Sequence, residues 1–228
     1  MITTEELASR LDAVRAKRGY LLPHHGLMAL TAPDLLAAYD AAYTELALAD
    51  RSLSHHDREF VWLAILIATD EAIATHHIEK FNAAGGTDTE AAAALSVTAT
   101  VCGFRAYGFI RDHWAGHLPG LDLETLWREA VMRAGVGAET RLVHLAACAV
   151  QVCNADWSGL EWQIRAAYVA GVPEADLAEA MSLCMFPASV PYFVEAAKVW
   201  QQLITDGRVE ASAPYRAWAA LSQGGHGT

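Results

Sequence analysis

The feature of the sequence that most constrains its fold is an internal repeat. At a shift of 86 residues, identical side chains coincide without a gap between about residues 58 and 114. The matched pairs are Asp70 and Asp156, Ile78 and Ile164, Ala84 and Ala170, Gly85 and Gly171, Ala92 and Ala178, Ala94 and Ala180, and Trp114 and Trp200. Alanine pairs arise easily by chance because about a fifth of the chain is alanine, so the aspartate, glycine and tryptophan pairs carry the inference. The repeat predicts two copies of one structural unit.

Helix start and stop signals punctuate the chain and strand signals are nearly absent, which predicts an all-α fold. Thr3 and Thr87 open capping boxes, and Ser54 and Asp122 are N-cap residues. The predicted helices span about residues 4–18, 31–49, 54–68, 70–84, 87–102, 104–114 and 122–134. Residues 20–28 are predicted to form an apolar loop between the first two helices.

The predicted organisation packs two fused repeats into one compact unit. Residues 115–121, with two glycines and a proline, are the best linker candidate. The predicted segments are N-terminal helices and a loop at 1–53, repeat one with the active site at 54–115, a linker and helix at 116–137, repeat two with a degenerate site at 138–206, and a C-terminal helix and tail at 207–228.

Composition and charge exclude several classes of protein. The chain is 54% hydrophobic and 19% charged, too apolar for a disordered protein and too often interrupted by charges for a membrane span. Its net charge of −11 repels phosphate backbones and anionic membrane surfaces, so neither a nucleic acid nor a membrane is expected as a partner. The four cysteines form no CxxC or zinc spacing and no signal peptide is evident, which favours the cytoplasm.

Several motifs of repeat one together resemble a known family. The chain reads Asp57-Arg-Glu-Phe-Val-Trp-Leu-Ala, then His77 eight residues before Gly85, then Thr87-Asp-Thr-Glu-Ala, and later Cys102-Gly-Phe-Arg-Ala-Tyr107. This order is similar to that of the carboxymuconolactone decarboxylase and alkylhydroperoxidase-D-like superfamily, over most of residues 19–115 and more weakly over 139–203. The resemblance implies an all-helical fold, a homo-oligomer with sites near subunit contacts, and a trimer if six units form a ring.

The sequence departs from the peroxidase branch of that superfamily. The family's CxxC would occupy the positions of Asp70 and Ile73, and repeat two has Asp156 and Gly159 there. None of these side chains can form a thiolate, so dithiol peroxidase chemistry at this site is disfavoured. The decarboxylase-like branch, which lacks the cysteine pair but keeps the histidine, is the better match.

His77 and Glu59 are the candidate catalytic residues. On the predicted helix 70–84, Asp70, Ile73 and Phe81 share the face of His77, and Glu59 shares its face with Trp62. A buried carboxylate needs a partner, for which Arg58, His55 and His77 are alternatives. At the 86-residue shift the second copy has Leu145 and Gln163 instead. The repeat therefore predicts one proficient site per chain, although a purely structural core histidine is the alternative.

The remaining candidates are assigned to substrate binding. Arg105 stands where the second copy has Pro191, and either clamps a substrate carboxylate or is a solvated surface side chain. Trp62, Ile73 and Phe81 are predicted pocket walls, and His24 either covers the pocket mouth or is a plain loop histidine. Asp70, Glu71 and His76 are secondary candidates. Adjacent histidines on a helix point about 100° apart, so the His-His pairs predict no metal site, and no cofactor is expected.

These residues predict a cofactor-free lyase, most simply a decarboxylase, whose substrate is a small anionic acid or lactone. Loss of carbon dioxide next to a carbonyl leaves an enolate or dienolate, and a histidine can protonate it near neutral pH. An isomerase, or another lyase that breaks a C–C or C–O bond, would use the same enolate. A non-catalytic binding protein of the superfamily is the alternative from a different class.

Overall fold

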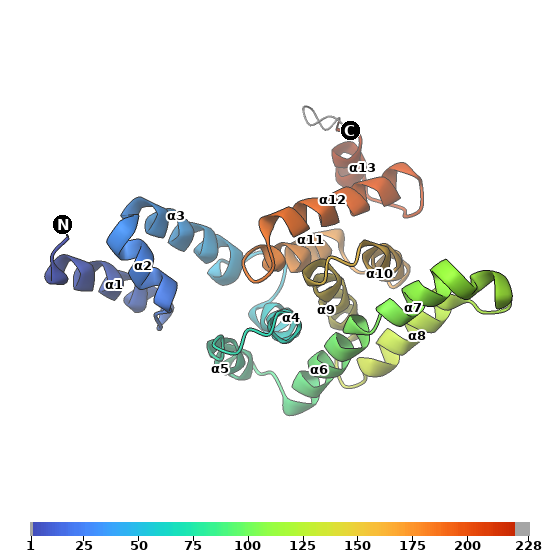
Figure 1. Cartoon of the computed structure of the whole chain (residues 1–228), viewed down its shortest axis with the longest axis horizontal. Coiled ribbons are helices and arrows are strands. Elements are labelled where there is room, and N and C mark those ends of the chain that lie inside the picture. Colours follow the sequence, from blue (N-terminus) through green and yellow to red (C-terminus); the bar gives the residue numbers. More distant parts are fainter. Residues whose placement is uncertain (1, 222–228) are drawn as a thin grey trace. The chain divides into compact units, whose positions relative to one another are not determined.

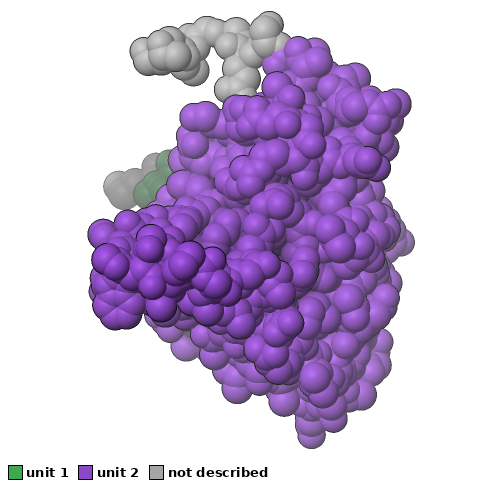
Figure 2. Space-filling model, turned by 90° about the vertical axis from the view of Figure 1, so that its right-hand side faces the viewer, with its two compact units in different colours: residues 1–49 green, residues 50–228 purple. Residues whose placement is uncertain are grey.

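The computed structural model describes residues 2–221, and within that range it contains helices and no strands. The predicted all-α fold is confirmed. The chain divides into two compact units, Met1–Ala49 and Asp50–Thr228, which are coloured separately in Figure 2. The division falls near the expected boundary at residue 53, and residues 54–221 all lie in the second unit, including the segment 115–121 that was expected to act as a linker.

The first unit contains α1 (Thr4–Arg18), α2 (Pro23–Thr31), α3 (Pro33–Tyr43) and the π-helical turn η1 (Thr44–Leu48). The capping box at Thr3 is present, and Gly19 ends α1 in the left-handed conformation with φ of 81°. The expected apolar loop is wrong because residues from Pro23 onward form α2. Proline is favourable at the start of a helix, and His25 Nδ1 accepts a hydrogen bond from Leu22 N as a capping side chain would.

The second unit is built around one central helix. Its elements are α4 (His55–Ala68), α5 (His76–Ala83), α6 (Asp88–Cys102), α7 (Arg105–Phe109), η2 (Ile110–Trp114), η3 (Ala115–His117), α8 (Leu123–Ala134), α9 (Thr140–Cys153), α10 (Trp157–Val169), α11 (Glu174–Ser182), η4 (Leu183–Met185), α12 (Val190–Thr205) and α13 (Ala213–Ala219). Every residue from 142 to 152 of α9 is buried, and this helix packs against α4, α6, α10 and α11 (Figure 1).

The predicted helix over residues 70–84 is wrong at its start, because α5 begins only at His76. Asp70 adopts a positive φ of 53°, a region that its short polar side chain tolerates, and Glu71 N donates to Leu66 O to close α4. Asp70, Glu71 and Ile73 therefore lie in a turn. The helical-face argument that grouped Asp70 and Ile73 with His77 does not hold, whereas Phe81 lies one turn after His77 on α5.

The run Asp88–His117 is long and apolar enough to cross a membrane by length and composition alone. Core helices of soluble proteins pass the same test. Ala93, Ala94, Val97 and Val101 are buried, and α6 packs against α4 and α9. One face of α6 therefore packs in the second unit, and a third of the apolar window is buried.

Candidate functional site

The structure brings Glu59 and His77 together in the second unit. Glu59 lies on α4 and is fully buried, and His77 lies in the first turn of α5 and is 2% exposed. His77 Nδ1 is 2.6 Å from Glu59 Oε2. The indole of Trp62, one turn after Glu59, stacks on the imidazole with ring centroids 4.6 Å apart. The His76 ring lies 4.4 Å from the His77 ring.

Glu59 fixes the tautomer of His77. A carboxylate only accepts, so Nδ1 carries the proton that it donates to Glu59 Oε2, and Nε2 is the unprotonated nitrogen of the neutral ring. Of the three partners expected for Glu59, His77 contacts it directly. Arg58 is bound instead by Glu179 of α11, with its Nε 3.1 Å from Glu179 Oε1.

Two polar atoms beside this pair lack hydrogen-bond partners among the described residues. Glu59 Oε1 is a buried acceptor and Trp62 Nε1 is a buried donor. The two residues are three positions apart on α4 and so share a face. Buried polar groups are nearly always paired, so the two atoms are suited to a bound molecule or water that both donates and accepts hydrogen bonds.

An apolar groove of about 740 Å³ runs along α4, α5 and α6. Its walls include Leu63, one turn after Glu59, and Phe81, one turn after His77. The other residues that line it are Leu66, Ile67, Asp70, Glu71, Ala72, Ala74, Thr75, Ile78, Asn82, Asp88, Ala91, Ala92 and Leu95. Glu59 and His77 do not line the groove themselves. The groove therefore lies next to the pair, with Leu63 and Phe81 on the adjoining turns.

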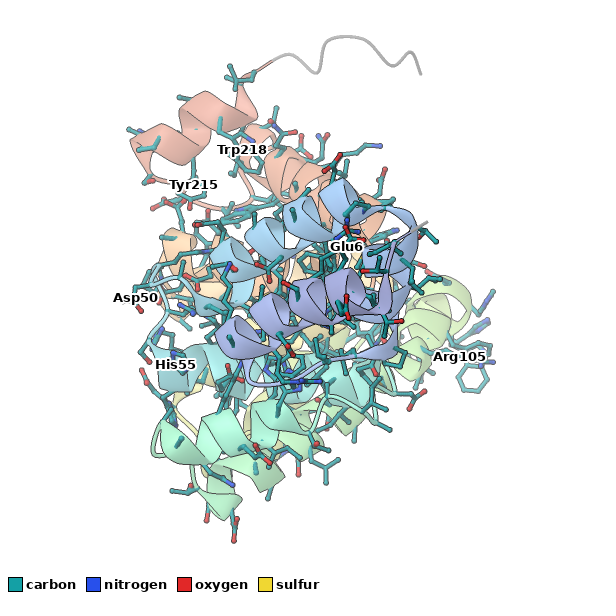
Figure 3. All side chains as sticks on the ribbon, turned by 90° about the vertical axis from the view of Figure 1, so that its left-hand side faces the viewer. Glu6, Asp50, His55, Arg105, Tyr215 and Trp218 are labelled. Carbon is teal, nitrogen blue, oxygen red and sulfur yellow. The ribbon has the colours of Figure 1, made fainter. Side chains whose placement is uncertain are left out.

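The charges that line this groove are all negative. Asp70, Glu71 and Asp88 are exposed at its edge, and no lysine, arginine or histidine of the described part of the chain lines it. Arg105 is exposed at the start of α7 and does not reach the groove. In Figure 3 it lies at the edge of the second unit, away from His55 at the start of α4. The structure therefore does not place Arg105 beside His77.

The other expected contacts fall in different places. Ile73 is 60% exposed in the turn before α5 and is not a wall of the groove. His24 belongs to α2 of the first unit, where its Nε2 lies 3.1 Å from the hydroxyl of Tyr39. Among residues 2–221, no group of three or more His, Cys, Asp or Glu side chains is arranged to hold a metal ion.

The second half of the unit contains a buried pair that the sequence comparison missed. Gln163 Nε2 of α10 donates to His144 Nδ1 of α9 over 2.8 Å. Helices α4 and α9 are both 14 residues long and begin 85 residues apart, at His55 and Thr140. With this spacing, His144 occupies the position in α9 that Glu59 occupies in α4. His77 and Gln163 lie 86 residues apart, so the two paired positions are separated by one more residue in the second half than in the first.

A second contact supports the same register. Thr98 Oγ1 of α6 donates to Ala64 O, and Cys184 Sγ donates to Ala149 O. Ala64 and Ala149 lie 85 residues apart, whereas Thr98 and Cys184 lie 86 apart. The ungapped comparison that set Leu145 against Glu59 is therefore corrected. The position equivalent to Glu59 holds a buried histidine, and this half keeps a polar pair with a neutral amide partner.

Burial of His144 makes stability depend on pH. Burial is the main cause that lowers the pKa of His144 from 6.5 to about 4, and the positive charge of Arg128 contributes to the same shift. Because the unfolded chain takes up this proton at a higher pH than the folded chain, stability is lost as pH falls from 6.5 towards 4. When the pH is lowered from 7 to 4.5, we expect the unfolding free energy of the wild type to fall by about 2–3 kcal/mol more than that of His144→Gln. Urea denaturation at both pH values measures this, and equal losses would contradict it.

One comparison with known proteins found a match, and it covers the segment that contains Glu59 and His77. Residues 33–108 match the Carboxymuconolactone decarboxylase family. The match covers about a third of the chain and supports the resemblance to this superfamily. The matched segment contains Glu59, Trp62, His77 and Arg105, and it ends before the predicted second repeat. No curated protein and no solved structure matches the chain.

The match agrees with the helices of the described residues and with the resemblance seen in the sequence. The duplication of the unit remains a prediction. The matching contacts at Glu59 and His144, and at Thr98 and Cys184, are the structural observations that favour it.

Proposed function

We propose that the protein is a cofactor-free, decarboxylase-like lyase in which His77 is the general acid–base and Glu59 orients it. The observation that carries the proposal is the buried hydrogen bond of 2.6 Å between His77 Nδ1 and Glu59 Oε2. A carboxylate behind an imidazole fixes the tautomer and stabilises the protonated ring when a proton arrives. The superfamily match supports a reaction of this class.

The substrate would be a small keto acid or carboxylated lactone that enters from the groove between α4, α5 and α6. The body of the substrate would contact Leu63 and Phe81, and displacement of the Phe81 ring would open the way to His77. The acidic edge disfavours a dianion, so we propose a monoanion with a largely apolar body. Trp62 Nε1 would donate to the developing enolate oxygen, since it is a buried donor without a partner among the described residues.

In the proposed reaction the bond between the carboxylate carbon and the adjacent carbon breaks. Its electron pair moves into the neighbouring carbonyl, carbon dioxide leaves, and protonated His77 Nε2 delivers a proton to the resulting enolate carbon. A carboxylate beside Asp70 and Glu71 is destabilised relative to neutral carbon dioxide, which favours its departure. Arg105, exposed on α7, has no step in this scheme.

The same pair would serve an isomerase or another lyase that forms an enolate. A non-catalytic binding function is the alternative that one observation favours, because His77 is buried and does not line the groove.

We also propose that the chain assembles as a homo-oligomer, with a trimer favoured, and acts in the cytoplasm.

A substrate screen in deuterium oxide tests the proposal. Purified protein is incubated with β-keto acids and carboxylated lactones while carbon dioxide release is measured, and the products are examined for deuterium. We expect catalysed release from at least one monoanionic acid, with one deuterium at the carbon that carried the carboxylate. Binding of such acids without release or isomerisation would favour the non-catalytic alternative.

A further inference from the structure

The second unit contains a pair of thiols outside the proposed site. Cys184 of η4 is fully buried, and its Sγ donates to Ala149 O over 3.2 Å. Ala149 lies one helical turn before Cys153, the last residue of α9. After burial, the neighbouring Cys153 thiol is the next largest cause that raises the pKa of the Cys184 thiol. The fold thus brings together two cysteines that lie far apart in the sequence.

The pair differs from the other cysteines in access and in neighbours. Cys153 is partly exposed, whereas Cys148 and Cys184 are buried, and burial raises the pKa of both of the latter thiols. Cys102 is exposed, and its Sγ lies 3.6 Å from Asn154 Nδ2. A reagent in solution therefore reaches Cys153 before it reaches Cys184, and Cys184 is the thiol held beside the last turn of α9, which ends at Cys153.

We propose that Cys153 and Cys184 form a disulfide by exchange with a small-molecule disulfide. The sulfur of Cys153, after losing its proton, attacks one sulfur of the reagent, and the first reagent thiol leaves with a proton. The sulfur of Cys184 then attacks Cys153 Sγ, and its own proton accompanies the second reagent thiol. Two protein thiols are oxidised to one disulfide while one reagent disulfide is reduced to two thiols.

This bridge would join the end of α9 to η4 and enclose α10 and α11. Helix α9 packs against α4, which carries Glu59. The disulfide would therefore restrain the helix that α4 of the proposed site packs against. The inference does not depend on the proposed function, since it concerns thiols that take no part in the reaction.

The test uses the full chain carrying Cys102→Ser, which removes the exposed thiol, and native treatment with 4,4′-dithiodipyridine. We expect two equivalents of thiopyridone per chain and a protein lighter by two hydrogen atoms, without bound reagent. Peptide mapping under non-reducing conditions should then identify a Cys153–Cys184 link. A stable reagent adduct on Cys153, or a link to Cys148, would overturn the proposal.

Two further variants in the same background separate the steps. Adding Cys184→Ser should give one equivalent of thiopyridone and a protein that keeps the reagent, and serine should be tolerated because Thr98 makes the equivalent hydroxyl contact to Ala64 O. Adding Cys153→Ser should give essentially no release from the folded protein. Two equivalents from either variant would contradict the proposed pairing.

Discussion

Replacing His77 with glutamine is expected to lower the rate of carbon dioxide release by about 10²- to 10⁴-fold, the range that a general acid or base contributes. Glutamine retains a donor for Glu59 Oε2 but cannot deliver a proton from the place of Nε2. The rate would be measured with the acid found in the substrate screen, and circular dichroism would check that the helices are intact.

The second half of the unit supplies a matched control for this prediction. His144→Gln changes a buried histidine at the position equivalent to Glu59, in a pair that already has a glutamine partner. We expect its rate to stay within about threefold of the wild type, a free-energy difference of well under 1 kcal/mol. Equal losses in His77→Gln and His144→Gln would indicate that both histidines serve the fold and neither is catalytic.

Replacing Glu179 with alanine is expected to lower the unfolding free energy by about 3–5 kcal/mol, because it removes the buried carboxylate that binds the buried guanidinium of Arg58. Arg58 is 1% exposed and donates to Glu179 Oε1 over 3.1 Å. Glu179 Oε2 also accepts from Ser52 N at 2.6 Å and from Leu53 N at 2.9 Å. The substitution therefore also removes the acceptor of two backbone N–H groups just before the start of α4.

Urea denaturation followed by circular dichroism measures this loss. The matched control is Glu129→Ala, which removes an exposed pair with Arg133 on α8 and should cost about 0–1 kcal/mol. If Glu179→Ala also loses less than about 1 kcal/mol, the network around Arg58 does not anchor α4. Because Arg58 precedes Glu59 in the chain, this anchor also positions the carboxylate of the proposed site.

The sequence predicted the helices where a capping side chain or a glycine marks an end. Thr87 and Asp122 cap α6 and α8 as expected, and both Gly85 and Gly171 have positive φ values. It did not predict the turn at Asp70, because a non-glycine residue in the left-handed region leaves no clear signal in an apparently continuous helical pattern.

The candidate site was predicted in part. His77 was one of three partners expected for Glu59, because a buried carboxylate needs a partner. His144 was missed because the paired positions are one residue further apart in the second half, and a comparison without gaps cannot detect this change of register. The partner of Arg58 could not be predicted because Glu179 lies about 120 residues away and approaches only through the packing of α11.

The measurement that tests the central claim most directly is a double-mutant cycle on carbon dioxide release. The rates of wild type, Glu59→Gln, His77→Gln and the double variant are compared with one acid under identical conditions. If Glu59 acts through His77, the double variant should be no slower than His77→Gln alone. Losses that multiply in the double variant, or a full rate in His77→Gln, would contradict the account.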